Sequence, residues 1–163
     1  MSFHTLLKTK IKNRQELSSH LEGLRRSKKK IVFTNGCFDI LHPGHVDYLS
    51  QARDLGEFLI LGLNTDNSVK RLNKAPNRPI NNEQTRAMVL AGLASIDAIV
   101  LFDEETPYEL IKLIKPDVLV KGDDYTVEKI VGYDVVKAQG GEVVTIPFLE
   151  GYSTTKLIQK ILQ

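Results

Sequence analysis

The chain has 163 residues, of which 42% are hydrophobic and 26% are charged, and its 22 Lys and Arg nearly balance its 20 Asp and Glu. This composition is typical of one globular domain, and it excludes collagen-like, disordered and coiled-coil proteins. The small net charge argues against broad nucleic-acid binding. The one cysteine, Cys37, cannot form an internal disulfide, and no apolar run approaches the roughly 18 residues of a membrane helix. We therefore expect a soluble, cytoplasmic protein with neither a nucleic-acid nor a membrane partner.

Five short apolar runs predict five strands, at residues 31–33, 58–61, 98–102, 118–120 and 143–146. Their apolar residues are consecutive rather than alternating, which is typical of parallel strands that are covered on both faces. Segments with helical spacing lie between and after them, around residues 46–52, 88–93, 110–114, 130–136 and 153–162. The alternation predicts an α/β fold, a doubly wound, Rossmann-like five-stranded parallel sheet with helices on both faces.

The N-terminal region differs from the rest of the chain because no predicted strand lies in it. Residues 1–29 are predicted to form a helical extension, and residues 30–163 a single domain, since no long linker divides them. The basic stretch from Arg25 to Lys30 is interpreted as a solvated lead-in to the first strand rather than a nucleic-acid patch.

Polar residues follow every predicted strand, at 34–39, 64–66, 103–104, 121–124 and 147–155. Ligands of open α/β sheets bind outside the carboxyl ends of the strands. Loops at that edge are polar in any such fold, so one of them alone is weak evidence. All five together predict a small-molecule site.

The strongest cluster is the sequence His-Pro-Gly-His that begins at His42. Proline suits the first position of a helix, and His42 and His45, three residues apart, then project from the same side of its opening turn. Both rings would lie beside free backbone N–H groups at the positive end of the helix dipole, where anions bind and imidazoles stay neutral. Gly36 and Gly44 leave the backbone open to a phosphate. The cluster predicts a phosphate-binding site.

A second candidate site lies where the last helix begins, at Ser153 and Thr154. Their hydroxyls and backbone N–H groups could bind phosphate, although N-capping by Ser153 alone is the simpler interpretation. Positive charge for a triphosphate could come from Lys74, Arg78 or Arg86. Asp39 and Asp66 could equally be ligands, helix caps or turn residues.

Other chemistry is not indicated. The chain lacks the G-x-x-x-x-G-K-[ST] and G-x-G-x-x-G phosphate motifs and the G-x-S-x-G elbow of hydrolases. Zinc needs three or four ligands, so His42 and His45 with Cys37 as the one thiol do not predict a metal site.

The stretch from Thr34 to His45 resembles the H-x-G-H motif of the nucleotidylyltransferase superfamily. The similarity covers about residues 30 to 162. One subfamily, the adenylyltransferase domain of ADP-heptose synthase, shares further segments in the same order, at 78–81, 119–125, 140–144 and 153–155.

The resemblance implies transfer of the adenylyl group of ATP to D-glycero-β-D-manno-heptose 1-phosphate, a step toward lipopolysaccharide core or related surface glycans. Mg²⁺ is expected to bridge the ATP phosphates. The resemblance also implies a homo-oligomer. Because no kinase segment precedes this stretch, it further implies a stand-alone form with a separate heptose kinase acting upstream.

The same resemblance implies roles for individual residues. His42, His45, Lys74 and Arg86 are the predicted catalytic residues, and they would act on the phosphates. Nucleotide binding is predicted for Phe33, Thr34, Asn35, Gly36, Cys37, Phe38, Asp39, Gly44, Lys121, Gly122, Asp123, Asp124, Ser153 and Thr154.

Two alternatives stay open. Glycerol-3-phosphate cytidylyltransferases share the H-x-G-H motif and the ending found here from Glu150 to Thr155, but they carry Arg in place of Phe148 and Trp in place of Tyr125. Asp123 resembles that family, whereas the longer match over 119–144 favours heptose and ATP. A nucleotide-binding module without turnover is the second alternative.

Overall fold

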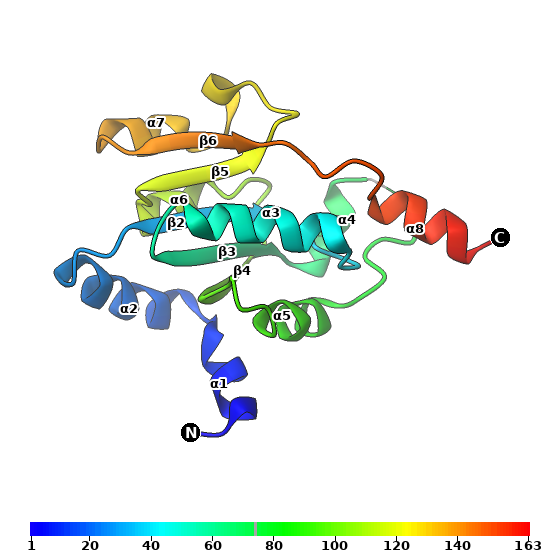
Figure 1. The fold of residues 1–163 in the computed structure, drawn as a ribbon, viewed down its shortest axis with the longest axis horizontal. Coiled ribbons are helices and arrows are strands. Elements are labelled where there is room, and N and C mark those ends of the chain that lie inside the picture. The colour runs from blue at the N-terminus through cyan, green and yellow to red at the C-terminus, as the bar shows by residue number, and fades with distance from the viewer. Residues whose placement is uncertain (74) are drawn as a thin grey trace.

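The structure is a computed structural model that describes residues 1–73 and 75–163. Its helices are α1 (Phe3–Lys10), α2 (Arg14–Arg26), α3 (Pro43–Asp54), α4 (Asp66–Arg71), α5 (Glu83–Ala91), α6 (Tyr108–Ile114), α7 (Tyr133–Ala138) and α8 (Thr154–Ile161), with a 3₁₀ turn, η1 (Val127–Lys129). Its strands are β1 (Ile11–Lys12), β2 (Ile31–Gly36), β3 (Phe58–Asn64), β4 (Ala98–Phe102), β5 (Val118–Gly122) and β6 (Glu142–Ile146). Together they form one twisted sheet flanked by helices (Figure 1).

The sheet is parallel throughout the described residues, with the strand order β1-β4-β3-β2-β5-β6. This confirms the predicted doubly wound α/β fold, but the predicted number of five strands is one short. The additional strand, β1, pairs Ile11 with Ile99 and Lys12 with Val100. Two residues are too few to show a hydrophobic period, so this strand could not be recognised within the predicted helical extension.

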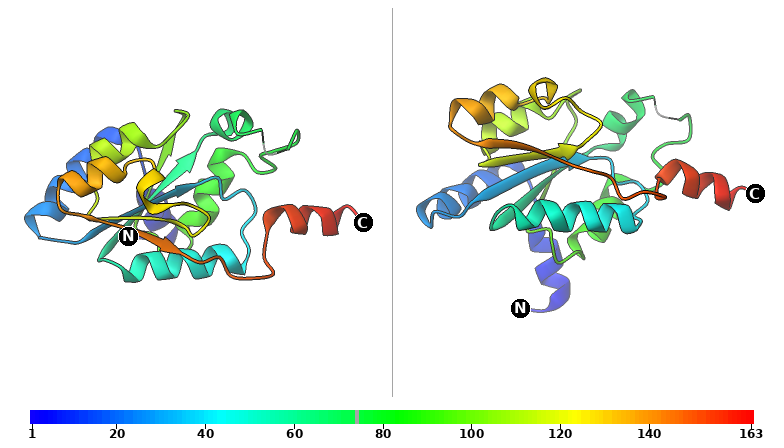
Figure 2. Two further views of the ribbon diagram at one scale, coloured as in Figure 1. Left: turned by 90° about the horizontal axis from the view of Figure 1, so that it is seen from above. Right: turned by 45° about the horizontal axis from the view of Figure 1, so that its top comes forward.

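Consecutive apolar residues in the strands point alternately to two cores, one on each face of the sheet. Val32 belongs to the core that α3 and α5 cover, whereas its neighbours Ile31 and Phe33 belong to the core under α2 and α6. Figure 2 shows helices on both sides of the sheet. Leu17 of α2 is fully buried in the second core, so the region from 1 to 29 packs against the sheet.

The predicted helix around 130–136 is shorter than expected and begins later. The 3₁₀ turn η1 ends before Ile130, and α7 begins at Tyr133 after Gly132, whose φ of +90° lies in the left-handed region. Glycine adopts that conformation without steric cost. A Cβ atom there would also lie 2.6 Å from Ile111, so both the conformation and the packing require glycine.

The strand order places a topological switch point between β2 and β5. The chain runs outward from β2 through β3 to β4, and then returns to the other side of β2 to form β5 and β6. The carboxyl ends of the central strands face the side from which α8 projects (Figure 1). Crevices at such switch points are where open α/β sheets bind ligands.

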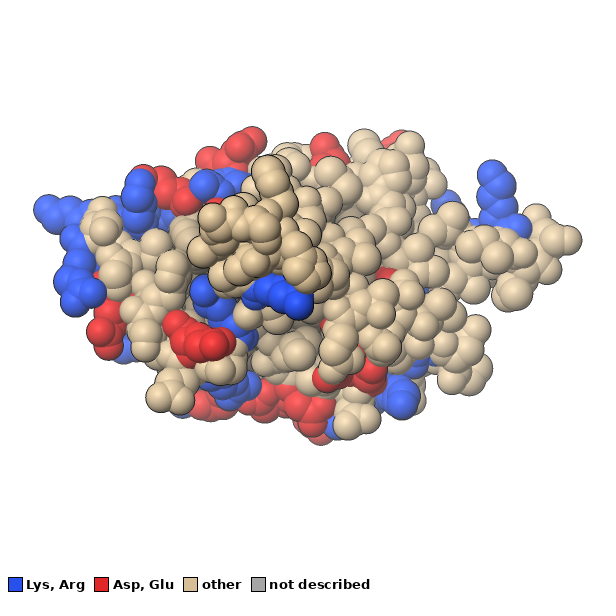
Figure 3. Space-filling model, turned by 90° about the horizontal axis from the view of Figure 1, so that it is seen from below, with Lys and Arg blue, Asp and Glu red and all other residues tan. Residues whose placement is uncertain are grey.

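The surface carries mixed charge. On the face shown in Figure 3, lysine and arginine side chains lie among aspartate and glutamate side chains. Among the described residues, no helix is long and apolar enough to cross a membrane.

Candidate active site

The predicted histidine pair lies at the start of α3. His42 is the N-cap residue, its side chain makes no capping hydrogen bond, and Pro43 occupies the first helical position. The rings of His42 and His45 stack with centroids 3.8 Å apart and an interplanar angle of 19°. In both rings Nδ1 is buried and has no hydrogen-bond partner among the described residues. Buried nitrogens are normally paired, so this geometry points to a ligand.

Both histidines are neutral at pH 7. Burial, together with repulsion from Arg78 and from any proton that His42 carries, lowers the pKa of His45 from 6.5 to about 4. Burial also lowers the pKa of His42. A neutral imidazole donates one hydrogen bond and accepts one, so each ring can donate to an anionic oxygen.

The backbone around these rings is kept free of side chains at two glycines. A Cβ atom on Gly44 would lie 3.1 Å from the His42 ring and 3.3 Å from Tyr152. A Cβ atom on Gly36 would lie 2.8 Å from the Phe38 ring, which in turn lies 5.3 Å from the His45 ring. The glycines therefore allow the loop after β2 to fold closely around the start of α3.

Asp39 holds this loop to the segment that precedes α5. Its buried carboxylate accepts hydrogen bonds from Arg78 Nε at 2.5 Å and from the backbone N–H groups of Ile80 and Asn81, both at 2.9 Å. The Asn81 side chain donates back to the Asp39 carbonyl at 2.8 Å. Both carboxylate oxygens of Asp39 accept hydrogen bonds from the protein itself. The geometry therefore favours a role for Asp39 in holding the loop in place over direct contact with a nucleotide.

Arg86 holds together the segments that surround the histidine pair. Its guanidinium is fully buried and donates to the carbonyls of Cys37, Asn64 and Asn81 and to the carboxylate of Asp66, at 2.7 to 3.0 Å. These acceptors lie in the loop after β2, at the end of β3, at the start of α4 and just before α5. The geometry therefore favours a positioning role for Arg86 over the direct phosphate contact that the sequence predicts.

The other predicted residues of β2 and of the loop after it lie either in the core or at the rim of the crevice. The side chains of Phe33 and Thr34 are fully buried, so only their backbone could reach a ligand, whereas Asn35 and Cys37 are half-buried at the rim. Thr34 Oγ1 lies 2.8 Å from the hydroxyl of Tyr48 on α3. Burial raises the pKa of Tyr48 to about 12. The sequence analysis did not identify Tyr48, because its hydrogen-bond partner Thr34 is 14 residues away along the chain.

The end of β5 lies beside the end of β2, as the strand order requires. Lys121 Nζ donates to Asn35 Oδ1, which joins the two strands at the switch point. Gly122 is buried, whereas Asp123 and Asp124 are exposed. The structure thus brings the predicted nucleotide-binding segments of β2 and β5 together.

The start of α8 reaches the same place. Ser153 caps α8 by accepting from the Lys156 N–H at 3.2 Å, which matches the simpler capping interpretation. Thr154 Oγ1 makes a long hydrogen bond of 3.4 Å to the Ile40 carbonyl, and the Tyr152 ring lies 6.1 Å from that of His42. The two helix starts, of α3 and α8, therefore lie next to each other.

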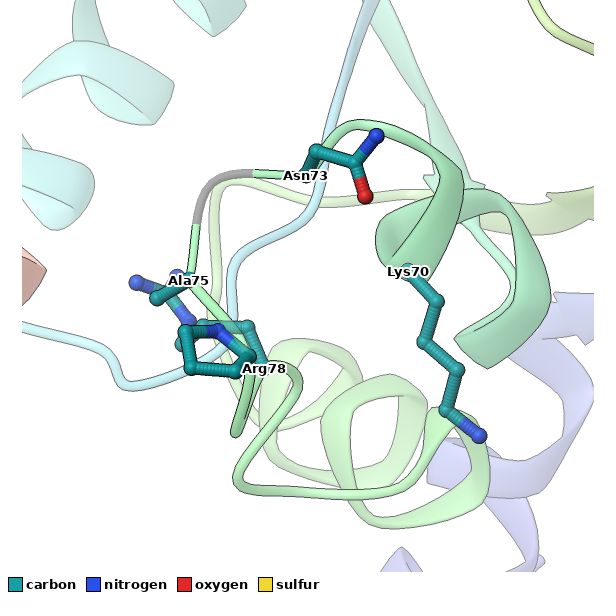
Figure 4. Close-up of a pocket in the computed structure, with 5 residues that line it drawn as sticks. Lys70, Asn73, Ala75 and Arg78 are labelled. Atoms are coloured by element: carbon teal, nitrogen blue, oxygen red, sulfur yellow. The ribbon is translucent and has the colours of Figure 1, made fainter.

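Two hollows flank this arrangement. One of about 330 Å³ lies between α4 and the segment before α5, with Lys70 and Arg78 on opposite sides of it (Figure 4). The other, of about 790 Å³, runs along the first turns of α3 past His42, Val46 and Leu149. Lys74, which the sequence predicts to be catalytic, lies outside the described residues.

Comparison with known proteins agrees with this geometry. The family described as Cytidylyltransferase-like matches residues 33–160. The Bifunctional protein HldE of Syntrophotalea carbinolica is 53% identical over 163 residues, which are 99% of this chain and 33% of that protein. The Bifunctional protein HldE of Caulobacter vibrioides is 57% identical over 152 residues, 93% of this chain and 31% of that protein. The chain therefore spans about a third of the length of these curated relatives.

Solved structures share the fold. The lipopolysaccharide core biosynthesis protein from Thermoplasma volcanium superposes with a TM-score of 0.59 at 27% identity, over 77% of this chain and 99% of that chain. A pantoate-beta-alanine ligase from Francisella tularensis, crystallised with beta-gamma ATP and beta-alanine, gives a TM-score of 0.62 at 18% identity, over 93% of this chain and 77% of that chain. The second likeness concerns the fold alone.

Proposed function

Because the chain belongs to the cytidylyltransferase-like family and is a nucleotidyltransferase, we propose that it transfers the adenylyl group of ATP to D-glycero-β-D-manno-heptose 1-phosphate. The products would be ADP-heptose and pyrophosphate. As part of the same proposal, the protein acts in the cytoplasm as a homo-oligomer.

One observation carries the proposal. At the start of the 12-residue helix α3, two stacked histidine rings stay neutral and leave both Nδ1 atoms buried without a partner. The adjacent helix N-terminus adds a positive field that favours an anion, while the His45 N–H already donates to the His42 carbonyl at 2.9 Å. Such a group of donors suits the oxygens of a phosphate chain.

The reaction would proceed by in-line attack. An oxygen of the acceptor phosphate attacks the α-phosphorus of ATP, a new P–O bond forms, and the bond from that phosphorus to the bridging oxygen of the β-phosphate breaks. The attacking oxygen is already ionised near pH 7, so no side chain needs to remove a proton. Catalysis then consists of positioning and of stabilising charge on the phosphate oxygens.

Each helix start would have its own task. His42 and His45 would donate to the phosphate oxygens around the reacting phosphorus. Ser153 and Thr154, next to them, would bind the β- and γ-phosphates that leave. Asp39 and Arg86 would hold the loops in place without touching the substrate.

Mg²⁺ belongs to the proposal as the ion that accompanies the ATP phosphates. The described residues contain no group of three His, Cys, Asp or Glu side chains that could hold a metal ion. We therefore assign no protein ligand to the ion. Mg²⁺ bound mainly by substrate phosphates and water fits its usual coordination.

The acceptor is supported by two similarities. The segment 119–144 resembles the heptose-specific subfamily, and a solved relative at 27% identity is named as a lipopolysaccharide core biosynthesis protein. A cytidylyltransferase acting on glycerol 3-phosphate is the second candidate, and the sequence Gly-Asp-Asp at Gly122 favours it.

Pyrophosphate release tests the proposal directly. Purified protein with Mg²⁺ is given ATP or CTP, each combined with heptose 1-phosphate or glycerol 3-phosphate, and the product is identified by mass spectrometry. We expect turnover with ATP and heptose 1-phosphate. Turnover only with CTP and glycerol 3-phosphate would establish the second candidate instead. ATP binding without pyrophosphate release from any pair would indicate a module without turnover.

A further inference from the structure

An aromatic side chain lies exposed at the switch point of the sheet. Phe148 is 56% exposed, although Ile146, two residues before it at the end of β6, is only 4% exposed. A Cβ atom built on Gly122 would lie 2.1 Å from Cζ of Phe148. The tip of the ring therefore rests on the backbone at the carboxyl end of β5, while much of the rest of the ring faces solvent.

The surroundings of Phe148 belong to the crevice between β2 and β5. Its ring centroid lies 6.2 Å from that of Tyr48, whose hydroxyl is hydrogen-bonded to that of Thr34 in β2. The same hypothetical Cβ atom on Gly122 would lie 2.9 Å from the carboxylate of Asp124. The ring thus lies where the ends of both strands, α3 and the loop after β5 meet.

We propose that Phe148 is a specificity-determining residue that stacks on the base of the bound nucleotide and favours a purine over a pyrimidine. The proposal rests on the proposed nucleotidyl transfer. A phenylalanine ring has no hydrogen-bonding group, so it cannot bind phosphate, but it offers a flat apolar face to a flat base. A purine covers more of that face than a pyrimidine does. The histidines at the start of α3 would then hold the phosphates while Phe148 selects the base.

Gly122 makes this placement possible. Any side chain at that position would meet the Phe148 ring, and because the ring is the free end of an exposed side chain, it would be displaced rather than the fold broken. Gly122 and Phe148 should therefore act as one unit in base selection.

Steady-state kinetics test the role of the ring. Stacking of a base on an aromatic side chain changes affinity by about tenfold. We expect Phe148→Ala to raise KM for ATP about tenfold and KM for CTP by about twofold or less, with kcat nearly unchanged. The matched control is Phe3→Ala, because Phe3 is an exposed phenylalanine on α1, away from the crevice. A KM for ATP that stays within about twofold of the wild-type value in Phe148→Ala would overturn the proposal.

A double-mutant cycle tests the proposed unit. Gly122→Ala should raise KM for ATP about as much as Phe148→Ala does, and the double variant should show little further increase. Circular dichroism and thermal melting establish that each variant is folded. Fully additive effects in folded variants would show that the two positions act independently, against the proposal.

Fluorescence separates this inference from the proposed reaction. The chain has no tryptophan, so Phe148→Trp introduces a single tryptophan at the crevice, which can be excited selectively over the 5 tyrosines, and Phe3→Trp serves as the control. We expect ATP alone to change the emission of Phe148→Trp in a saturable way, CTP to act more weakly, and the control to stay constant. If these emission changes are seen but no acceptor is turned over, base stacking by Phe148 is supported and only the proposed reaction is contradicted. Constant emission in a variant that still releases pyrophosphate would overturn the role of Phe148.

Discussion

Two helices, α3 and α8, begin with residues that suit phosphate binding, but they are built into the molecule very differently. Tyr48 and Leu49 of α3 are buried in a core, whereas α8 buries none of its residues. Figure 2 shows α8 projecting from the body. The start of α8 is held by the 3.4 Å bond from Thr154 to Ile40 and by the neighbouring rings of Tyr152 and His42.

The difference shows that a helix start becomes a rigid site only when other segments brace it. At α3, the buried side chains of Asp39 and Arg86 fix the preceding loop through hydrogen bonds. At α8 no comparable brace exists among the described contacts. Donors at α3 are therefore in place before the ligand arrives, whereas those at α8 would lose conformational freedom when they bind it.

The largest expected effect follows from removing the brace of α3. Arg86→Met leaves the carbonyls of Cys37 and Asn64 and the Asp66 carboxylate without their donor, so the free energy of unfolding should fall by about 3–5 kcal/mol. Urea denaturation measures it. The control is Arg71→Met, because the ion pair between Arg71 and Asp103 is exposed and should contribute less than about 1 kcal/mol. Similar losses in the two variants would contradict the bracing role.

The next effect concerns turnover. His45→Ala removes a preorganised donor from the phosphate site and should lower kcat by about 10²–10³-fold while the protein stays folded. Pyrophosphate release measures kcat, and circular dichroism checks the fold. His4→Ala, an exposed histidine on α1, should behave like the wild type. Near-normal turnover in folded His45→Ala protein would refute the assignment.

Acidification should weaken the α3 side of the site. The pKa of His45 is about 4 in the folded protein and 6.5 without its surroundings, so between these values the unfolded chain binds more protons. The free energy of unfolding should therefore fall as pH drops from about 6.5 to 4, by about 2 kcal/mol given the partial exposure of the ring, and this contribution should stay constant below pH 4. Urea titrations at several pH values measure the slope. His45→Gln should show a shallower slope, and an unchanged slope would contradict the assignment.

A smaller effect is expected at α8. Thr154→Val keeps the shape of the side chain but removes its hydroxyl, so KM for ATP should rise about tenfold, as for one hydrogen bond to a charged group. Gln159→Ala, farther along the same helix, should leave KM unchanged. If Thr154→Val also leaves KM unchanged, α8 does not take part in binding the nucleotide.

The smallest expected effect is protection of α8 from trypsin by bound ATP. Trypsin should cleave after Lys156 or Lys160 early, because the helix buries nothing against the body. ATP with Mg²⁺ should slow these cleavages about threefold by populating the bound arrangement, since a site that orders on binding is protected in proportion to its occupancy. Cleavage after the exposed Lys28 should not change. Mass spectrometry of timed digests measures all three cleavage rates. If cleavage after Lys156 and Lys160 is equally fast with and without ATP, α8 does not become ordered when the nucleotide binds.

Much of the fold could be predicted because each buried parallel strand is an uninterrupted apolar run, and helical segments separate one run from the next. The histidine pair could be predicted because it depends on neighbours along one helical turn. The strand β1 was missed, since two residues show no pattern. The bracing role of Arg86 was missed for a different reason: its acceptors on Cys37, Asn64 and Asp66 come from separate segments that only the folded chain brings together.

The two-residue strand β1 has a consequence for solubility rather than for chemistry. By pairing with Ile99 and Val100, it covers part of the outer edge of β4, whose N–H and C=O groups would otherwise be open to strands of other molecules. Lys12 places a charged residue on that edge, and charge there disfavours edge-to-edge association. The first dozen residues therefore help to keep the sheets of two copies from pairing edge to edge at β4.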